Sequence, residues 1–123
     1  MNISSNINFF LGLQSQIKIM HWQTKGYAKH KALDETLDEL YDLVDQFVEE
    51  AMGKYGRFKL DEETKTIQLS NLSEIDTKAM IDTVCDALTQ YNQQFEENDT
   101  NLLNIRDEML GLFRKLQYLL TLQ

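Results

Sequence analysis

The two histidines, the only ones in the chain, are the residues around which a chemical site could form. His21 lies near the end of a first segment with helical periodicity, and His30 lies near the start of a second. Asp34 follows His30 by four residues, so on a helix the two side chains lie on the same face. Imidazole nitrogen and carboxylate oxygen together suit iron, zinc or manganese. The sequence therefore predicts a metal site that includes His21, His30 and Asp34.

A second pair of ligand types, Asp45 and Glu49, follows on the same segment with the same spacing of four. At about 100° per residue, both carboxylates lie within about 100° of His30 around a helix. Asp38 and Tyr41 fall among them. A solvated acidic helix face would have the same carboxylate pattern, and it is the two histidines that favour a metal site.

The distance along the helix decides how these groups can cooperate. His30 and Asp45 are separated by about 22 Å at a rise of about 1.5 Å per residue, so they cannot bind the same ion. If two copies of the helix cross antiparallel near Glu39, the His30 end of one copy meets the Asp45 end of the other. A two-fold axis then generates two identical sites. We therefore expect a homodimer in which each site takes ligands from both chains.

The periodicity of apolar residues predicts the helices that carry these groups. A first helix is expected from Ser5 to Lys25, with Gly26 as its stop. A second is expected from Lys29 to Met52, ended by Gly53 and Gly56. The two form a helical hairpin with a very short turn.

The second half of the chain predicts another hairpin of helices. Residues 57–72 lose the helical period and suggest short extended pieces, as a small hairpin or a short irregular helix. Ser73 is expected to cap a third helix that continues to Phe95, and a fourth helix is expected from Leu102 to Leu119. Two helical hairpins joined by a crossover predict an all-α four-helix bundle.

Composition restricts the class of protein. A length of 123 residues without a change in composition predicts one domain over residues 1–123, and the absence of proline favours helices. The net charge of −8 opposes non-specific binding to nucleic acid and favours cations. Cys85 is the only cysteine, so the chain can form no internal disulfide. Without a basic leader or a long apolar run, we expect a cytoplasmic protein that does not enter membranes.

The histidine and carboxylate pattern resembles the Dps mini-ferritins, a family of the ferritin-like superfamily. That family has a His-Trp pair at the end of its first helix, then a glycine, a second histidine and three carboxylates at fixed spacing. The similarity is close from about Leu13 to Gly56 and weaker in the last helix. The matching residues here are His21, Trp22, Gly26, His30, Asp34, Asp45 and Glu49.

The resemblance implies a ferritin-like bundle that oxidises Fe(II) with hydrogen peroxide or oxygen, for iron storage and protection against oxidative stress. It implies a ferroxidase centre with one or two irons across a dimer interface, and Trp22 beside the iron as an acceptor of stray oxidising equivalents. The assembly would be at least a homodimer and, as in the family, a twelve-subunit shell. The lysine-rich tail of the family is missing, so DNA binding by that route is not expected. The implied ligands are His21, His30 and Asp34 of one subunit with Asp45 and Glu49 of its mate.

Two alternatives stay open. The chain could be a structural or partner-binding helical oligomer without redox chemistry, or it could bind zinc or manganese without turnover. Other metal enzymes fit the sequence less well. Neither histidine has a Glu three residues before it, as ordinary ferritin sites require, and the chain contains no His-Glu-x-x-His or Cys-x-x-Cys motif.

Overall fold

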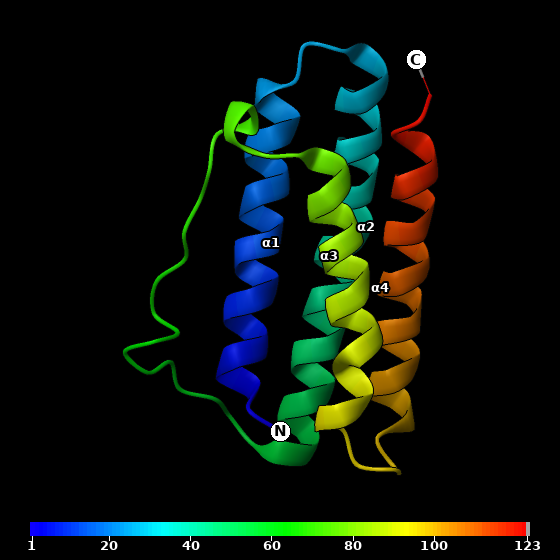
Figure 1. The fold of residues 1–123 in the computed structure, drawn as a ribbon. Coiled ribbons are helices and arrows are strands. Elements are labelled where there is room, and N and C mark those ends of the chain that lie inside the picture. Colours follow the sequence, from blue (N-terminus) through cyan, green and yellow to red (C-terminus); the bar gives the residue numbers. More distant parts are fainter. Residues whose placement is uncertain (123) are drawn as a thin grey trace.

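The computed structural model describes residues 1–122, which form helices and no strand. Helices α1 and α2 make one antiparallel hairpin, α3 and α4 make another, and a long crossover joins the two (Figure 1). The prediction of an all-α fold of four helices is confirmed. The elements are α1 (Ile3–Gln23), α2 (Tyr27–Tyr55), η1 (Leu72–Glu74), α3 (Thr77–Thr89), η2 (Gln90–Gln94) and α4 (Thr100–Leu119), where η marks a 3₁₀ turn.

The glycines of the first hairpin differ in role from the prediction. Gly26 does not stop α1, because Thr24 already follows the helix and Gly26 is the N-cap of α2, with an ordinary φ of −86°. Gly53 lies inside α2, and Gly56 ends it with a φ of +86°. This left-handed conformation costs glycine little, since glycine has no Cβ to clash with the backbone. As a result α2 is one unbroken helix of 29 residues.

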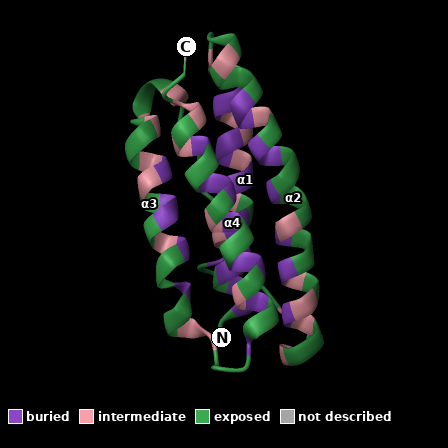
Figure 2. Ribbon diagram, turned by 90° about the vertical axis from the view of Figure 1, so that its right-hand side faces the viewer, coloured by how far each residue is buried: buried purple, intermediate pink, exposed green. Residues whose placement is uncertain are grey.

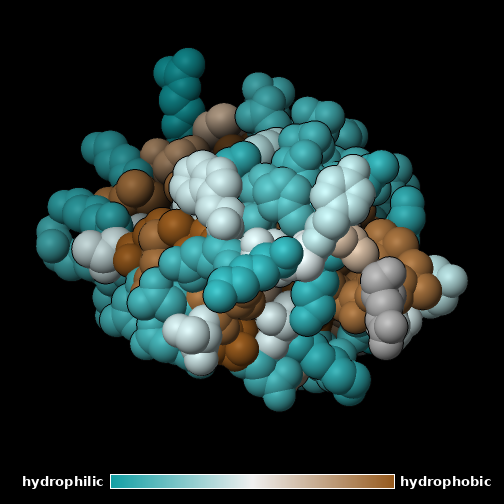
Figure 3. Space-filling view, turned by 90° about the horizontal axis from the view of Figure 1, so that it is seen from above, coloured by the Kyte–Doolittle hydropathy of each residue, from teal (hydrophilic) through white to brown (hydrophobic). Residues whose placement is uncertain are grey.

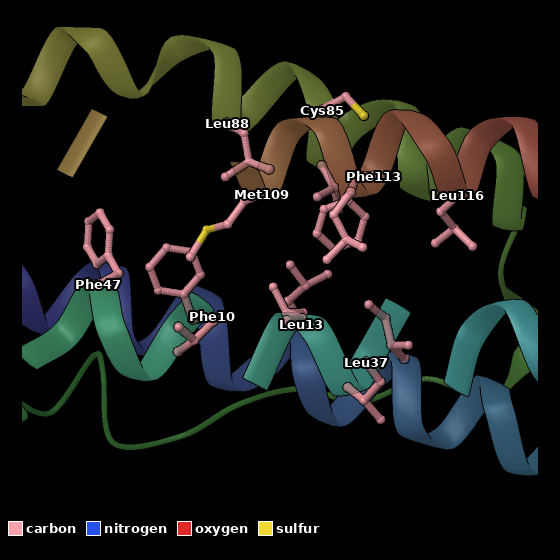
Figure 4. Close-up of a cluster of buried hydrophobic side chains, with 14 of the residues drawn as sticks. Phe10, Leu13, Leu37, Phe47, Cys85, Leu88, Met109, Phe113 and Leu116 are labelled. Atoms are coloured by element: carbon pink, nitrogen blue, oxygen red, sulfur yellow. The ribbon is translucent and has the colours of Figure 1, made fainter. Parts of the chain in front are cut away.

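The helices enclose one apolar core. α2 packs against both α1 and α4, and α3 packs against α4. The buried residues follow the inward faces of the helices (Figure 2). Phe10 and Phe47 meet edge to face with their centroids 5.2 Å apart, and Met109 approaches Phe10 from α4, with Phe113 further along the same helix (Figure 4). Each such side chain stabilises the fold by about 1.5–3 kcal/mol through removal of apolar surface from water.

The crossover, residues 56–71, is held against α1 by side-chain amides. Asn8 donates to the carbonyl oxygen of Thr66 at 2.7 Å. Gln16 donates to the carbonyl of Ser70 at 2.9 Å and accepts from its N–H at 2.8 Å. These backbone groups therefore bond to helix side chains instead of a second strand, and the small hairpin that was one predicted alternative does not form.

The start of the third helix differs from the prediction. Asp76 caps α3 by accepting a hydrogen bond from the backbone N–H of Ala79 at 3.1 Å. Ser73, the predicted cap, lies within η1 instead. Both residues are good capping types, so the sequence alone did not distinguish which one precedes the continuous helix.

The third helix also ends earlier than predicted. It stops at Thr89, and Phe95 lies beyond η2. The side chain of Arg106, 8% exposed, donates from Nη1 to the carbonyl oxygen of Leu88 at 2.9 Å. The carbonyl oxygen of Leu88 also accepts from the backbone N–H of Gln90, so the guanidinium of Arg106 adds a side-chain partner at this helix end.

The outer surface is mainly polar. Seen from the end that carries the α1–α2 turn, hydrophilic side chains cover most of the molecule and apolar patches lie between them (Figure 3). α2 alone carries eight Asp or Glu residues and three Lys. Among residues 1–122, none of the helices has the combination of length and apolarity needed to cross a membrane.

A buried carboxylate joins the end of α2 to the start of α4. Asp99 is 0% exposed and accepts hydrogen bonds from Lys54 Nζ at 2.6 Å and from the Tyr55 hydroxyl at 2.5 Å. Burial alone would raise the pKa of Asp99, but these two bonds and the N–H of Glu96 outweigh it and lower the pKa to about 2. Although Asp99 is the N-cap residue of α4, its side chain makes no capping bond.

We expect Asp99→Ala to lower the free energy of unfolding by about 3 kcal/mol, because Lys54 and Tyr55 lose their shared buried partner. The exposed control Asp86→Ala on α3 should change it by less than about 0.5 kcal/mol. The pKa of Asp99 falls from 3.8 to about 2 on folding. Its contribution to the free energy of unfolding is therefore full above pH 4 and is lost as the pH falls through 2. Urea unfolding of wild type and variant at several pH values measures this. A difference between them that does not shrink below pH 4 would contradict the assignment.

Candidate metal site

Two histidine rings stack across the short turn between α1 and α2. His21 lies in the last turn of α1 and His30 in the first turn of α2, and only residues 24–26 separate the helices. The ring centroids are 3.9 Å apart and the planes are inclined by 25°. Nδ1 of each ring lies 2.9 Å from the backbone carbonyl oxygen of the other residue. The structure thus brings together the two histidines that the sequence singled out.

These reciprocal bonds determine which nitrogen of each ring can bind a ligand. A carbonyl oxygen only accepts, so Nδ1 of each neutral ring carries the proton and donates it. Nε2 then keeps its lone pair. Metal-binding histidines commonly donate their other N–H to a backbone carbonyl, which fixes the ring orientation and increases ligand basicity. The backbone therefore fixes the orientation of both rings and leaves the Nε2 lone pair of each without a proton.

Asp34 lies one helical turn after His30 and faces His21. Its Oδ1 is 3.7 Å from Nε2 of His21, which is too far for a hydrogen bond. Two ligands of one ion, each about 2.1 Å from it at a tetrahedral angle, are about 3.4 Å apart. The gap is therefore close to the size that a bridging ion requires. We call His21, His30 and Asp34 the half-site.

Asp45 and Glu49 lie far from the half-site of their own chain. Because α2 is unbroken, His30 and Asp45 are about 22 Å apart along it. Both carboxylates are exposed, and neither forms an ion pair with another residue of the described chain. Within residues 1–122, no three His, Cys, Asp or Glu side chains come close enough to hold a metal ion. A single chain therefore presents two separate, incomplete groups of possible ligands.

Trp22, expected beside the metal, is 64% exposed. The ammonium group of Lys18 lies 5.4 Å from the centroid of its ring, a cation–π contact. A positive charge at this distance makes it harder to remove an electron from the indole. Lys18 was not among the predicted site residues, although a lysine four residues before a tryptophan on a helix is a detectable signal. The redox role of Trp22 stays a prediction.

A groove between α1 and α2 runs beside Asp45. It encloses about 480 Å³ and is lined by apolar side chains that include Val48 and Phe58. Leu11 and Tyr41, at 46% and 43% exposed, form part of its wall. The sequence did not reveal this groove, because Phe58 reaches it from the crossover. Exposed apolar side chains grouped next to charged residues are typical of a protein–protein contact surface.

Residues 21–120 match a protein family described as a family of unknown function, DUF5856. The chain belongs to this family. The DUF5856 chain is also similar to the "uncharacterized 14.6 kDa protein in mobD-ri intergenic region" of Enterobacteria phage T4, with 34% identity over 123 residues that cover 97% of this chain and 91% of the phage protein. No solved structure matches it.

The predicted membership of the Dps mini-ferritins is therefore wrong. The family shown by the match is DUF5856, and not a Dps or ferritin-like family. The misleading pattern consists of ligand-type residues spaced by the geometry of a helical hairpin, and unrelated proteins share that geometry.

We expect both histidines of the metal-free protein to be protonated at Nδ1 in their neutral form, because a carbonyl oxygen accepts there. Long-range ¹H–¹⁵N NMR spectra distinguish the two tautomers. In His30→Ala the acceptor for His21 is a backbone carbonyl and is retained, so the tautomer of His21 should not change. A proton on Nε2 of either ring in the wild type would refute the arrangement.

Proposed function

We propose that this protein binds iron(II) and oxidises it at a site made of the half-site of one chain and Asp45 and Glu49 of a second. The observation that supports this best is the stacked histidine pair, whose Nε2 lone pairs are left available, that of His21 at 3.7 Å from Asp34. Nitrogen and carboxylate ligands suit iron(II), and the negative charge of carboxylates favours iron(III), so they assist oxidation. Iron is the substrate in this proposal.

The charge pattern of α2 supports an antiparallel pairing of two copies. Lys29 and Lys31 lie in its first two turns, whereas residues 34–50 carry eight acidic residues and no lysine or arginine. The helix macrodipole acts mainly on the first and last turns, where it disfavours Lys29 and favours Lys54, so it does not account for the acidic run between them. Two copies crossing head to tail near Glu39 would bring the lysines of one to the acidic half of the other.

The proposed reaction conserves atoms and charge. Two iron(II) ions lose one electron each, the O–O bond of hydrogen peroxide accepts both electrons and breaks, and two hydroxide ions form. With oxygen as oxidant, two electrons and two protons give hydrogen peroxide. Consumption of iron(II) and peroxide would protect against oxidative damage.

Storage of iron(III) would in addition need a closed assembly, such as a twelve-subunit shell, and a ferritin-like arrangement of the bundle. The single long crossover between two hairpins agrees with that arrangement. Native mass separates a dimer, which has no storage cavity, from a closed shell.

Oxidation of iron(II) by peroxide or oxygen should be faster with the protein than in buffer alone. His30→Ala and Asp45→Ala should each lower the protein-dependent rate by about tenfold or more, because each removes a direct ligand. Asp86→Ala, an exposed carboxylate on α3, should leave the rate unchanged. Stopped-flow absorbance of the iron(III) product measures these rates. A rate equal to that of buffer would exclude the oxidase activity.

A mixture of the two inactive variants tests whether the site is shared. In a mixed dimer of His30→Ala and Asp45→Ala chains, one site lacks both ligands and the other is intact. After the two variants are unfolded and refolded together, half of the dimers contain one chain of each variant. Each mixed dimer has one intact site out of two, so about one quarter of the wild-type rate should return. If all ligands belonged to one chain, mixing would restore nothing.

A second candidate is the binding of zinc or manganese without turnover. Two imidazole nitrogens with carboxylates suit zinc as well as iron, and this donor set favours neither. Tight zinc binding together with no acceleration of iron oxidation would favour this second candidate over the oxidase.

A further inference from the structure

The exposed side of α2 carries five carboxylates within a narrow sector of the helix. At about 100° per residue they span about 80° around the helix axis. We call them the acidic face: Asp34, Asp38, Asp42, Asp45 and Glu49. Four of them form no ion pair with any residue in the described part of the chain: Asp38, Asp42, Asp45 and Glu49.

The antiparallel pairing proposed above brings this face against its own copy. Asp38 and Asp42 lie nearest to the two-fold axis, so each approaches the same residues of the second chain. Lys29 and Lys31 approach the second chain at the ends of the pairing, so they do not offset the repulsion between Asp38 and Asp42 at its centre, and Glu35 already lies 4.0 Å from Lys31 in the same chain. Like charges brought together at an interface oppose association, and burial there removes the water that screens them.

The apolar contact available on this side of the bundle is small. Leu11 and Tyr41 are its exposed large apolar side chains next to the groove, at 46% and 43%. Obligate dimers instead bury broad apolar surfaces that resemble a protein core. The acidic face therefore needs added positive charge before the groove can close on a second copy.

We propose that a divalent metal ion controls this pairing, so that the chain is a monomer without metal and a dimer when metal occupies the shared sites. The inference rests on the shared site of the proposed function, and the partner is a second copy of this chain. Each ion brings positive charge to the acidic face and also joins the half-site of one chain to Asp45 and Glu49 of the other. By linkage, whatever strengthens metal binding strengthens pairing, and pairing strengthens metal binding.

Sedimentation velocity of the full chain tests this with redox-inert ions. The protein should sediment as a monomer in EDTA and as a dimer with Zn²⁺ or Mn²⁺. Asp45→Asn should raise the metal concentration needed for half-pairing by about tenfold or more, since it weakens a ligand. Asp86→Asn on α3 is the control and should behave as the wild type. A stable dimer in EDTA, or a monomer at saturating metal, would overturn the inference.

A second variant separates the effect of charge from that of ligation. Asp38→Asn with Asp42→Asn removes two charges of the acidic face near the axis and leaves all proposed ligands in place. This double variant should pair at a lower metal concentration than the wild type and should dimerise measurably in EDTA. If it needs as much metal as the wild type, repulsion is not what keeps the chains apart and the inference is wrong.

The outcomes distinguish this inference from the proposed function. A dimer that forms in EDTA and still oxidises iron(II) overturns metal-controlled pairing and leaves the oxidase activity intact. Pairing that depends on Zn²⁺ or Mn²⁺ without any acceleration of iron oxidation supports the control of assembly and removes the oxidase proposal.

Discussion

Two hydrogen bonds hold the half-site in place: His21 and His30 each donate from Nδ1 to the carbonyl oxygen of the other. They exist because the turn between α1 and α2 is so short that the end of one helix lies beside the start of the next. The carbonyl of His21 belongs to the last turn of α1, where carbonyl groups have no partner within the helix. The ring of His30 supplies that partner. One contact thus closes the hairpin, fixes the orientation of both rings and leaves both Nε2 atoms available.

Because α2 is long, the two groups of possible ligands on it can meet only if two chains associate. An unbroken helix keeps Asp45 and Glu49 far from the histidine pair of the same chain, and residues 34–50 carry eight acidic residues with no lysine or arginine among them. Neither feature stabilises an isolated chain. An antiparallel second copy would bring Asp45 and Glu49 of one chain to the half-site of the other, where a metal ion could be shared.

Sequence periodicity was sufficient for the helices and for the position of the half-site. Apolar residues at steps of three and four located α1, α2 and α4 closely, and the four-residue spacing placed Asp34 beside the histidines. Long-range contacts decided what periodicity could not. Arg106 of α4 bonds to a carbonyl in the last turn of α3, and Asp99 bonds to Lys54 and Tyr55 instead of capping its own helix. Family membership was wrong for a related reason, since the spacing of ligands follows from helix geometry and is not unique to one family.

The central claim is that one metal ion is held by side chains of two chains. A crystal of the protein grown with Zn²⁺ and measured at the zinc absorption edge tests it most directly, because anomalous scattering locates the ion independently of the protein atoms. We predict a peak about 2.1 Å from Nε2 of His21 or of His30, with a carboxylate oxygen from Asp45 of a second copy as a further ligand. Zinc bound only by residues of one chain, or bound at Nδ1, would contradict it.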